Sequence, residues 1–154
     1  MSKELITKFY EAFQDGDGQT MAAMYHADAS FSDAVFQNLN ASEAGAMWQM
    51  LIERSKGDLK IEFHSLEEGD GSATCIWEAR YPFSKTGRRV HNVIRSQMKF
   101  KDGKIIDHQD SFNFWKWSRM ALGMPGVLLG WTPVIKNKVQ TMARKGLDDY
   151  MNKK

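Results

Sequence analysis

Cysteine and proline are scarce in this chain, whose 154 residues include one cysteine and three prolines. Cys75 alone cannot close a disulfide within the chain, and no second cysteine completes a zinc-binding pattern. His64 and His91 likewise lack the spacing to nearby acids that a metal site needs. We therefore expect a protein of the reducing cytoplasm, with no metal and no cofactor.

Long hydrophobic runs are also missing. The longest, Met120–Ile135, is too short to span a membrane and contains Pro125, Pro133 and several glycines. The N-terminal segment MSKELITKFYEAF combines acidic residues with an amphipathic pattern and lacks the apolar core of a secretion signal. The sequence thus predicts neither a transmembrane helix nor export.

The charge that is present is unevenly distributed. Residues 1–112 carry 13 basic and 17 acidic side chains, a balance of −4, whereas residues 113–154 carry 8 and 2, a balance of +6. Hydrophobic residues make up 42% and charged residues 26%, which is typical of a globular domain and excludes a disordered or fibrous chain. The length fits one domain with a basic C-terminal tail.

The spacing of apolar residues predicts helices first and a sheet afterwards. Helical spacing predicts three short helices: residues 3–14, 20–25 and 42–56. Residues 29–36 instead alternate as a strand that places Asp33 on an otherwise apolar face. From Leu59 onward the period is two, and glycine-containing turns separate four strands: residues 59–66, 73–83, 90–100 and 105–114. Strands of about ten residues exceed the usual ~5–6 and favour a curled antiparallel sheet around a hollow, an α+β fold.

The tail leaves the sheet pattern after Trp115. A helix is predicted over residues 117–122, and Pro133 opens a basic amphipathic helix to about Tyr150. We expect residues 116–154 to be a helical extension of the same domain that covers it, closes a pocket or contacts a second copy, in preference to binding lipid. Its basic face lacks the interleaved aromatic residues of nucleic-acid binding, so we expect no nucleic-acid partner.

Two segments resemble a known superfamily. FYEAFQDGDGQTMAAMYHADASFSDAVF resembles the opening of nuclear transport factor 2-like proteins, and FKDGKIIDHQDSFNFW resembles their closing strand. This superfamily includes ketosteroid isomerase, limonene epoxide hydrolase and SnoaL-like polyketide cyclases. The resemblance implies a cone-like domain over residues 1–115, in which a curved antiparallel sheet and three N-terminal helices enclose a pocket for a small molecule. It also implies a homodimer through the convex face of the sheet.

The closing strand supplies the first candidate catalytic residues. His108, Asp110 and Phe112 share one face because side chains repeat every two residues along a strand. An acid beside an imidazole can orient it and raise its basicity. The resemblance to SnoaL-like cyclases implies that such an acid is the base and the histidine its partner. The alternative is that both residues lie on the convex face as a solvated pair.

The resemblance adds Asp33, at the position of the carboxylate that moves the substrate proton in ketosteroid isomerase. The tyrosine and the protonated acid of the isomerase oxyanion hole correspond to Phe9 and Ser96 here, so that hole is absent. Asp110 also matches the closing-strand acid of the epoxide hydrolases, whose remaining catalytic residues are not reproduced in residues 75–80. Asp33 has a plainer interpretation as a turn acid that binds nearby backbone groups.

Other side chains are candidates for the wall of the hollow, although aromatic residues of this kind more often belong to a core than to a ligand-binding wall. They are Phe9, Trp48, Trp77, Asn92, Ser96, Phe112 and Trp115. A register shift of one residue would replace Trp77, Asn92 and Ser96 by Glu78, His91 and Arg95.

Our functional hypothesis is a SnoaL-like protein that performs general acid/base chemistry, as an isomerase, cyclase or hydrolase, on an apolar cyclic or polyketide-like molecule. The alternative is a non-catalytic domain that binds a ligand or a protein.

Overall fold

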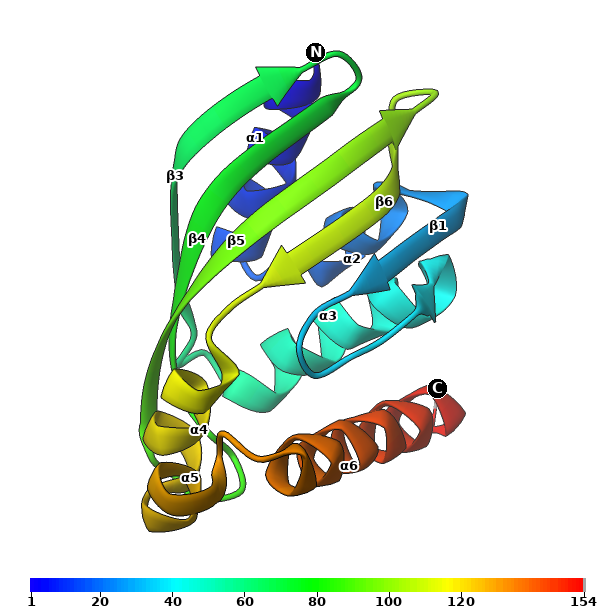
Figure 1. The fold of residues 1–154 in the computed structure, drawn as a ribbon. Helices are drawn as coiled ribbons and strands as arrows, with labels where there is room; N and C mark the ends of the chain where they lie inside the picture. Colours follow the sequence, from blue (N-terminus) through cyan, green and yellow to red (C-terminus); the bar gives the residue numbers. More distant parts are fainter. Residues whose placement is uncertain (154) are drawn as a thin grey trace.

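The computed structural model describes residues 1–153 as a six-stranded curved sheet with helices on its concave side (Figure 1). This confirms the α+β fold class. The helices are α1 (Ser2–Gln14), α2 (Gly18–Ala23), α3 (Ala41–Ser55), α4 (Phe114–Leu122), α5 (Met124–Leu129) and α6 (Pro133–Asn152). The strands are β1 (Tyr25–Ser32), β2 (Leu39–Asn40), β3 (Lys60–Gly69), β4 (Ser72–Pro82), β5 (Arg89–Lys101) and β6 (Lys104–Ser111).

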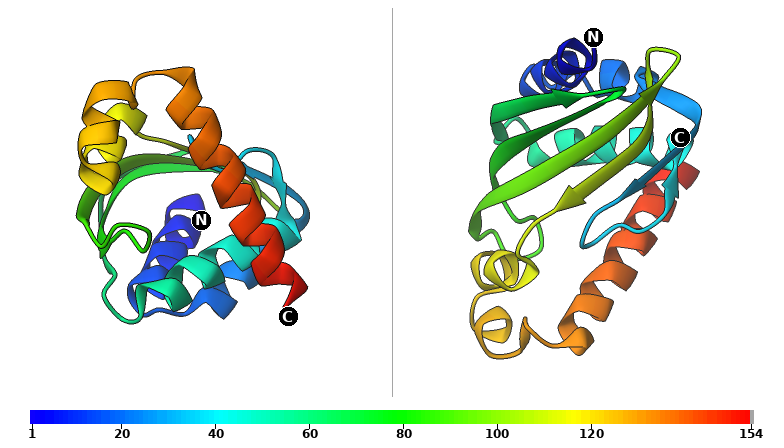
Figure 2. Two further views of the ribbon diagram at one scale, coloured as in Figure 1. Left: turned by 90° about the horizontal axis from the view of Figure 1, so that it is seen from below. Right: turned by 45° about the horizontal axis from the view of Figure 1, so that its top comes forward.

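The strands lie in the order β2-β1-β6-β5-β4-β3. Strands β3 to β6 form the expected antiparallel meander, whereas β1 pairs with β6 in parallel. The sheet is therefore mixed, and the short β2 at its edge was not predicted. The long strands curl, with α1, α2 and α3 beneath them (Figure 2).

The two faces of the sheet follow from the alternation along β5. Asn92, Ile94 and Ser96 are buried on the concave side, and their neighbours in sequence are exposed. The register pairs Asn92 with Ala79 and Ser96 with Cys75.

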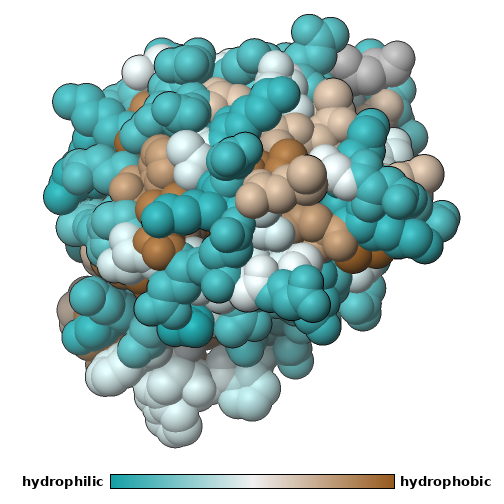
Figure 3. Space-filling view, turned by 90° about the horizontal axis from the view of Figure 1, so that it is seen from above, coloured by the Kyte–Doolittle hydropathy of each residue, from teal (hydrophilic) through white to brown (hydrophobic). Residues whose placement is uncertain are grey.

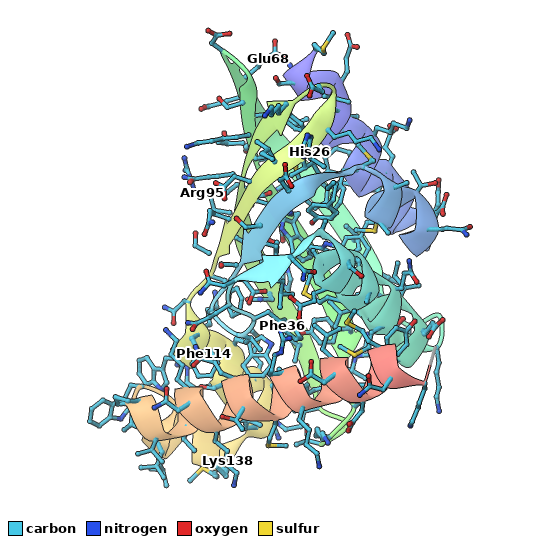
Figure 4. The ribbon with its side chains drawn as sticks, turned by 90° about the vertical axis from the view of Figure 1, so that its right-hand side faces the viewer. His26, Phe36, Glu68, Arg95, Phe114 and Lys138 are labelled. Atoms are coloured by element: carbon cyan, nitrogen blue, oxygen red, sulfur yellow. The ribbon has the colours of Figure 1, made fainter. Side chains whose placement is uncertain are left out.

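The shifted register is not observed. Glu78 lies on the outer face between His64 and His91, with carboxylate-to-nitrogen distances of 2.8 and 2.7 Å. Arg95 also projects from this outer face (Figure 4).

Several predicted boundaries were wrong: β1 begins at Tyr25 and not at residue 29, and the predicted ends of two strands also differ. Strand β1 ends at Ser32, and residues 33–36 form a turn in which the Asp33 amide donates to the carbonyl of Phe36 at 2.7 Å. Strand β6 ends at Ser111, and Phe114 begins α4 because the Asn113 side chain caps that helix. In both places a polar side chain that accepts a backbone N–H ends the strand.

The C-terminal helix α6 lies across the open side of the domain (Figures 1 and 2). Leu147 is fully buried, Arg144 forms an ion pair with Glu43 of α3, and the Gln140 amide donates to the carbonyl of Ala34 at 2.9 Å. The helix thus packs on α3 and on the turn after β1. No helix in the described part of the chain is both long and apolar enough to cross a bilayer.

Candidate active site

A cavity of about 290 Å³ lies between the concave face of the sheet and helices α3, α4 and α6. Most of its wall is apolar, and a few polar side chains line it from β4, β5, β6, the turn after β1, the end of α3 and the loop between β4 and β5. The apolar lining includes Phe13, Val35, Phe36, Met47, Trp48, Met50, Ile94, Phe112, Trp117, Val139 and Met142. Phe36 lies beside α6, which closes this side of the cavity (Figure 4). Such a hollow, apolar with few polar groups, has the character of a small-molecule site.

Asp110 lies in the wall of this cavity. It lies near the end of β6, opposite Ser96 of β5, and its side chain is 1% exposed. Oδ1 lies 2.8 Å from Nε2 of His108. Oδ2 is buried without a hydrogen-bond partner among residues 1–153. Because a buried carboxylate oxygen is costly to leave unsatisfied, Oδ2 is a ready acceptor for a ligand group.

His108 lies behind Asp110 and is fully buried. Its Nδ1 is 2.8 Å from the hydroxyl oxygen of Tyr25, which accepts a hydrogen bond from Nε1 of Trp48 at 2.7 Å. An ionised carboxylate can only accept, so we assign the imidazole proton to Nε2. The Tyr25 hydroxyl, which accepts from the indole, then donates to Nδ1. His108 therefore donates to Asp110. The chain from Trp48 through Tyr25 and His108 fixes the orientation of the carboxylate.

Ser96 completes this buried network. Its hydroxyl accepts from the Tyr10 hydroxyl at 2.8 Å and lies 3.1 Å from Nε2 of His108. Phe9 packs edge-on against His108, with ring centroids 5.6 Å apart. Ser96 and Phe9 are fully buried behind the wall and do not line the cavity.

Asp33 reaches the cavity from the turn after β1. Its Oδ1 accepts hydrogen bonds from the amides of Val35 at 2.7 Å and Phe36 at 2.6 Å, whereas Oδ2 has no such partner within the described residues. Burial raises the pKa of Asp33 to about 7. The two backbone hydrogen bonds and His108 act in the lowering direction, and the charge of Asp110 raises the pKa further. Asp33 therefore stabilises the turn through its backbone hydrogen bonds and also lines the cavity.

Hydrogen-bond donors line the same cavity. The Asn92 amide and Nε1 of Trp77 both lack hydrogen-bond partners in the described chain, and the Trp77 nitrogen is buried. The Tyr81 hydroxyl accepts from Nε1 of Trp117 at 2.9 Å, and burial raises its pKa. The residues that line this apolar cavity thus include hydrogen-bond acceptors and donors that have no partner in the described chain.

All but one of the expected wall and catalytic residues fall into two groups. Trp48, Trp77, Asn92 and Phe112 line the cavity together with Asp33 and Asp110. Phe9, Ser96 and His108 lie behind that wall.

Trp115 lies outside the cavity, which differs from our expectation. It is 40% exposed, and the Arg119 guanidinium lies 4.4 Å from its ring centroid. Because α4 begins at Phe114, Trp117 takes the inward position instead.

Several lining residues were not predicted. Tyr81 follows Trp77 and Ala79 at intervals of two on β4, and this alternation carried the signal for it. Val139 and Met142 have helical spacing on α6, but the sequence does not show what that helix covers. Among residues 1–153, no group of three or more His, Cys, Asp or Glu side chains is arranged to hold a metal ion.

The sequence and the fold were compared with those of known proteins. The profile of the SnoaL-like domain matches residues 6–108. The chain belongs to the SnoaL-like domain family. No curated protein matches it by sequence. The match ends at His108, so Asp110 and helices α4 to α6 lie beyond it.

Solved structures share the fold of this SnoaL-like domain. AclR, a proposed hydroxylase from Streptomyces galilaeus, is 16% identical, with a TM-score of 0.65 over 83% of this chain and 96% of its own. IdmH, a proposed polyketide cyclase from Streptomyces antibioticus, is 17% identical, with a TM-score of 0.63 over 76% and 95%. An LEH-like epoxide hydrolase from M. tuberculosis is 17% identical, with a TM-score of 0.61 over 82% and 94%. At these identities the likeness concerns the fold alone.

Proposed function

We propose that this SnoaL-like protein is an enzyme that moves protons on an apolar cyclic small molecule, with Asp33 and Asp110 as its acid/base groups. One observation carries the proposal. Two carboxyl groups line a single apolar cavity, and each has one oxygen without a hydrogen-bond partner in the described chain. Two carboxyl groups that line one cavity and have different surroundings are typical of general acid/base catalysis.

The two acids have different surroundings, which supports different roles. The pKa of Asp33 is raised to about 7, so near neutral pH this group can both give and accept a proton. Asp110 is held by His108, whose ring is fixed in turn by Tyr25. We propose that Asp110 removes a proton from the substrate and that Asp33 donates a proton to it. His108 is a positioning residue, since it does not reach the cavity.

The donors in the cavity support a substrate with a carbonyl group. Loss of a proton beside a carbonyl places negative charge on its oxygen, and a donor aimed at that oxygen lowers the barrier. Phe9 and Ser96 stand where the isomerases have their donors, but Asn92 and Trp77, two residues of the cavity wall, carry N–H groups without partners in the described chain. This set favours an isomerase-like or cyclase-like proton transfer over hydrolysis.

The size and lining of the cavity support a compact apolar ring system. About 290 Å³ accommodates a small molecule, and the aromatic walls favour flat or cyclic groups. The proposed cyclase and the epoxide hydrolase among the structural neighbours act, by their names, on small molecules. We further propose that the protein is cytoplasmic and forms a homodimer through the outer face of the sheet, where Val93 is exposed.

The test is a screen of cyclic ketones, polyketide-like phenols and epoxides for turnover and binding by the wild-type protein. Asp33→Asn and Asp110→Asn should abolish turnover while leaving affinity largely unchanged, because the apolar walls dominate binding. Asp107→Asn, on the other side of β6, is the matched control and should keep full activity. Binding that survives every substitution, with no turnover of any compound, would support a non-catalytic ligand-binding domain instead.

A further inference from the structure

Helix α5, the start of α6 and Trp115 of α4, whose indole donates to the Val127 carbonyl at 3.3 Å, form an apolar projection. We call it the α5 tip and define it by exposed hydrophobic side chains: Trp115, Met124, Val127, Leu128, Leu129, Trp131 and Val134. Their exposure ranges from 40% for Trp115 to 72% for Val134. The segment lies at one end of the molecule, beyond the sheet (Figure 1). Apolar patches of this kind on a domain surface mark sites of interaction.

The exposure of these side chains follows from the local packing. Within residues 124–131, Gly126 and Gly130 are the buried residues, and both lie against Ser118 of α4. A Cβ atom on either glycine would overlap Ser118. Gly126 of α5 and Gly130 directly after it therefore face the domain, and the large side chains of α5 face solvent. This is the reverse of a helix that covers a core.

The charge around the α5 tip has one sign. No acidic residue occurs from Phe112 to Leu147, and the basic residues near the tip are Arg88, Lys116, Arg119, Lys136 and Lys138. Within the described chain, Lys116, Lys136 and Lys138 form no ion pair. Lys138 lies on the side of α6 that faces away from the sheet (Figure 4). The opposite end of the molecule, seen from above, mixes hydrophilic side chains with smaller hydrophobic areas (Figure 3).

We propose that the α5 tip docks onto a lipid bilayer that contains anionic head groups. A convex apolar turn with two tryptophans suits the interfacial zone of a bilayer, where indole rings are favoured. The surrounding lysines and arginines complement anionic head groups. A second copy of the chain is a poorer occupant of the same face, because two cationic tips would repel each other.

Docking would hold the cavity next to the membrane. Trp117 and Leu122 of α4 and Val139 of α6 line that cavity, and the same two helices carry the α5 tip. The tip itself lies beyond residues 6–108, the part that matches the SnoaL-like profile. The lipid proposal stands on the exposed residues and the charge alone, so it is independent of the proposed chemistry.

The test uses the full chain with vesicles of phosphatidylcholine, with and without phosphatidylglycerol, and measures co-flotation. We expect binding to the anionic vesicles and much less to the neutral ones. Leu128→Gln combined with Leu129→Gln should reduce binding by at least about tenfold. The matched control, Leu128→Met combined with Leu129→Met, keeps the apolar character at the same positions and should bind like the wild type.

A second pair of variants tests the charge. Lys136→Gln with Lys138→Gln should weaken binding to anionic vesicles by about fivefold for each lysine. Lys99→Gln with Lys101→Gln, at the far end of β5, should have no effect. The proposal is overturned if the wild type binds neither kind of vesicle, or if both lysine pairs weaken binding equally. It is also overturned if the glutamine pair at 128 and 129 dissociates a dimer, seen by light scattering, without changing lipid binding. Circular dichroism establishes that each variant is folded.

Discussion

Asp33 and Asp110 line the same cavity, and the charge of Asp110 adds to the burial that raises the pKa of Asp33 to about 7. Asp33 also binds two backbone amides of its own turn, which act in the opposite direction. Burial dominates this balance. The protein thus holds a carboxyl group that exchanges its proton near neutral pH, and it does so by means of a turn that ends β1.

The raised pKa of Asp33 predicts a pH dependence of stability. The folded protein keeps the Asp33 proton up to about pH 7, whereas the unfolded chain loses it near pH 4. The free energy of unfolding therefore falls as the pH rises from about 4 to about 7. The loss is at most about 4 kcal/mol, an upper bound because Asp33 is partly exposed.

Asp33→Asn should remove this slope. The asparagine oxygen can still accept from both backbone amides, so the turn is kept. Urea unfolding at pH 5 and pH 8 measures the effect, and the variant should be the more stable protein at pH 8. Equal pH slopes for wild type and variant would show that Asp33 titrates normally.

Tyr25→Phe should destabilise the fold. It removes the hydroxyl that joins Nε1 of Trp48 to Nδ1 of His108 and leaves both atoms buried without this partner. We expect a loss of about 2–3 kcal/mol, measured by urea unfolding. Tyr10→Phe is the comparison, because it removes one hydrogen bond, to Ser96, and should cost about 1 kcal/mol. A larger loss for Tyr10→Phe would contradict the proposed role of Tyr25.

Trp77→Phe should separate ligand binding from stability. The Trp77 nitrogen is buried without a hydrogen-bond partner in the part of the chain that the structure describes, so its removal breaks no bond within the protein. We expect a stability change below that of Tyr25→Phe and a loss of affinity for carbonyl ligands of about tenfold. Isothermal titration with a ketone and with its hydrocarbon analogue makes the comparison. If both ligands lose affinity equally, the indole contributes packing and not a hydrogen bond.

Two helical glycines should respond with opposite signs to alanine. Gly126→Ala places a methyl group against the backbone of Ser118 and should cost about 1–3 kcal/mol. Gly146→Ala, inside α6, meets only the flexible end of Arg54 and should stabilise the protein by up to about 1 kcal/mol. Thermal unfolding of both variants is the measurement. A neutral Gly126→Ala would mean that α5 is not held against α4 as described.

The sequence predicted most of the sheet because its strands alternate clearly. The period of two along β4 and β5 indicated which side chains share a face but left open whether Trp77 and Asn92 or Glu78 and His91 face inward. The structure places Trp77 and Asn92 on the concave side. The strand predicted at residues 29–36 was wrong in its bounds. Phe31 and Val35 alternate like strand residues, but the carboxylate of Asp33 captures two amides and closes a turn.

The closure of the cavity could not be predicted from the sequence. The spacing of Val139 and Met142 identifies the apolar face of a helix but not the surface that this face covers. Trp115 and Trp117 were indistinguishable until the cap at Asn113 set the start of α4 and hence its inward face. Contacts between elements distant in the chain decide such assignments, and local patterns do not encode them.

The most direct test of the central claim is a carbon-13 NMR titration of the aspartate carboxyl groups, with Asp33 assigned by its loss in Asp33→Asn. Our account predicts that Asp33 titrates near pH 7 in the wild type. In Asp110→Asn it should titrate at lower pH, because the neighbouring charge is gone while burial remains. An Asp33 that titrates near pH 4 in both proteins would show that it is an ordinary turn acid, and the acid/base site proposed here would then be wrong.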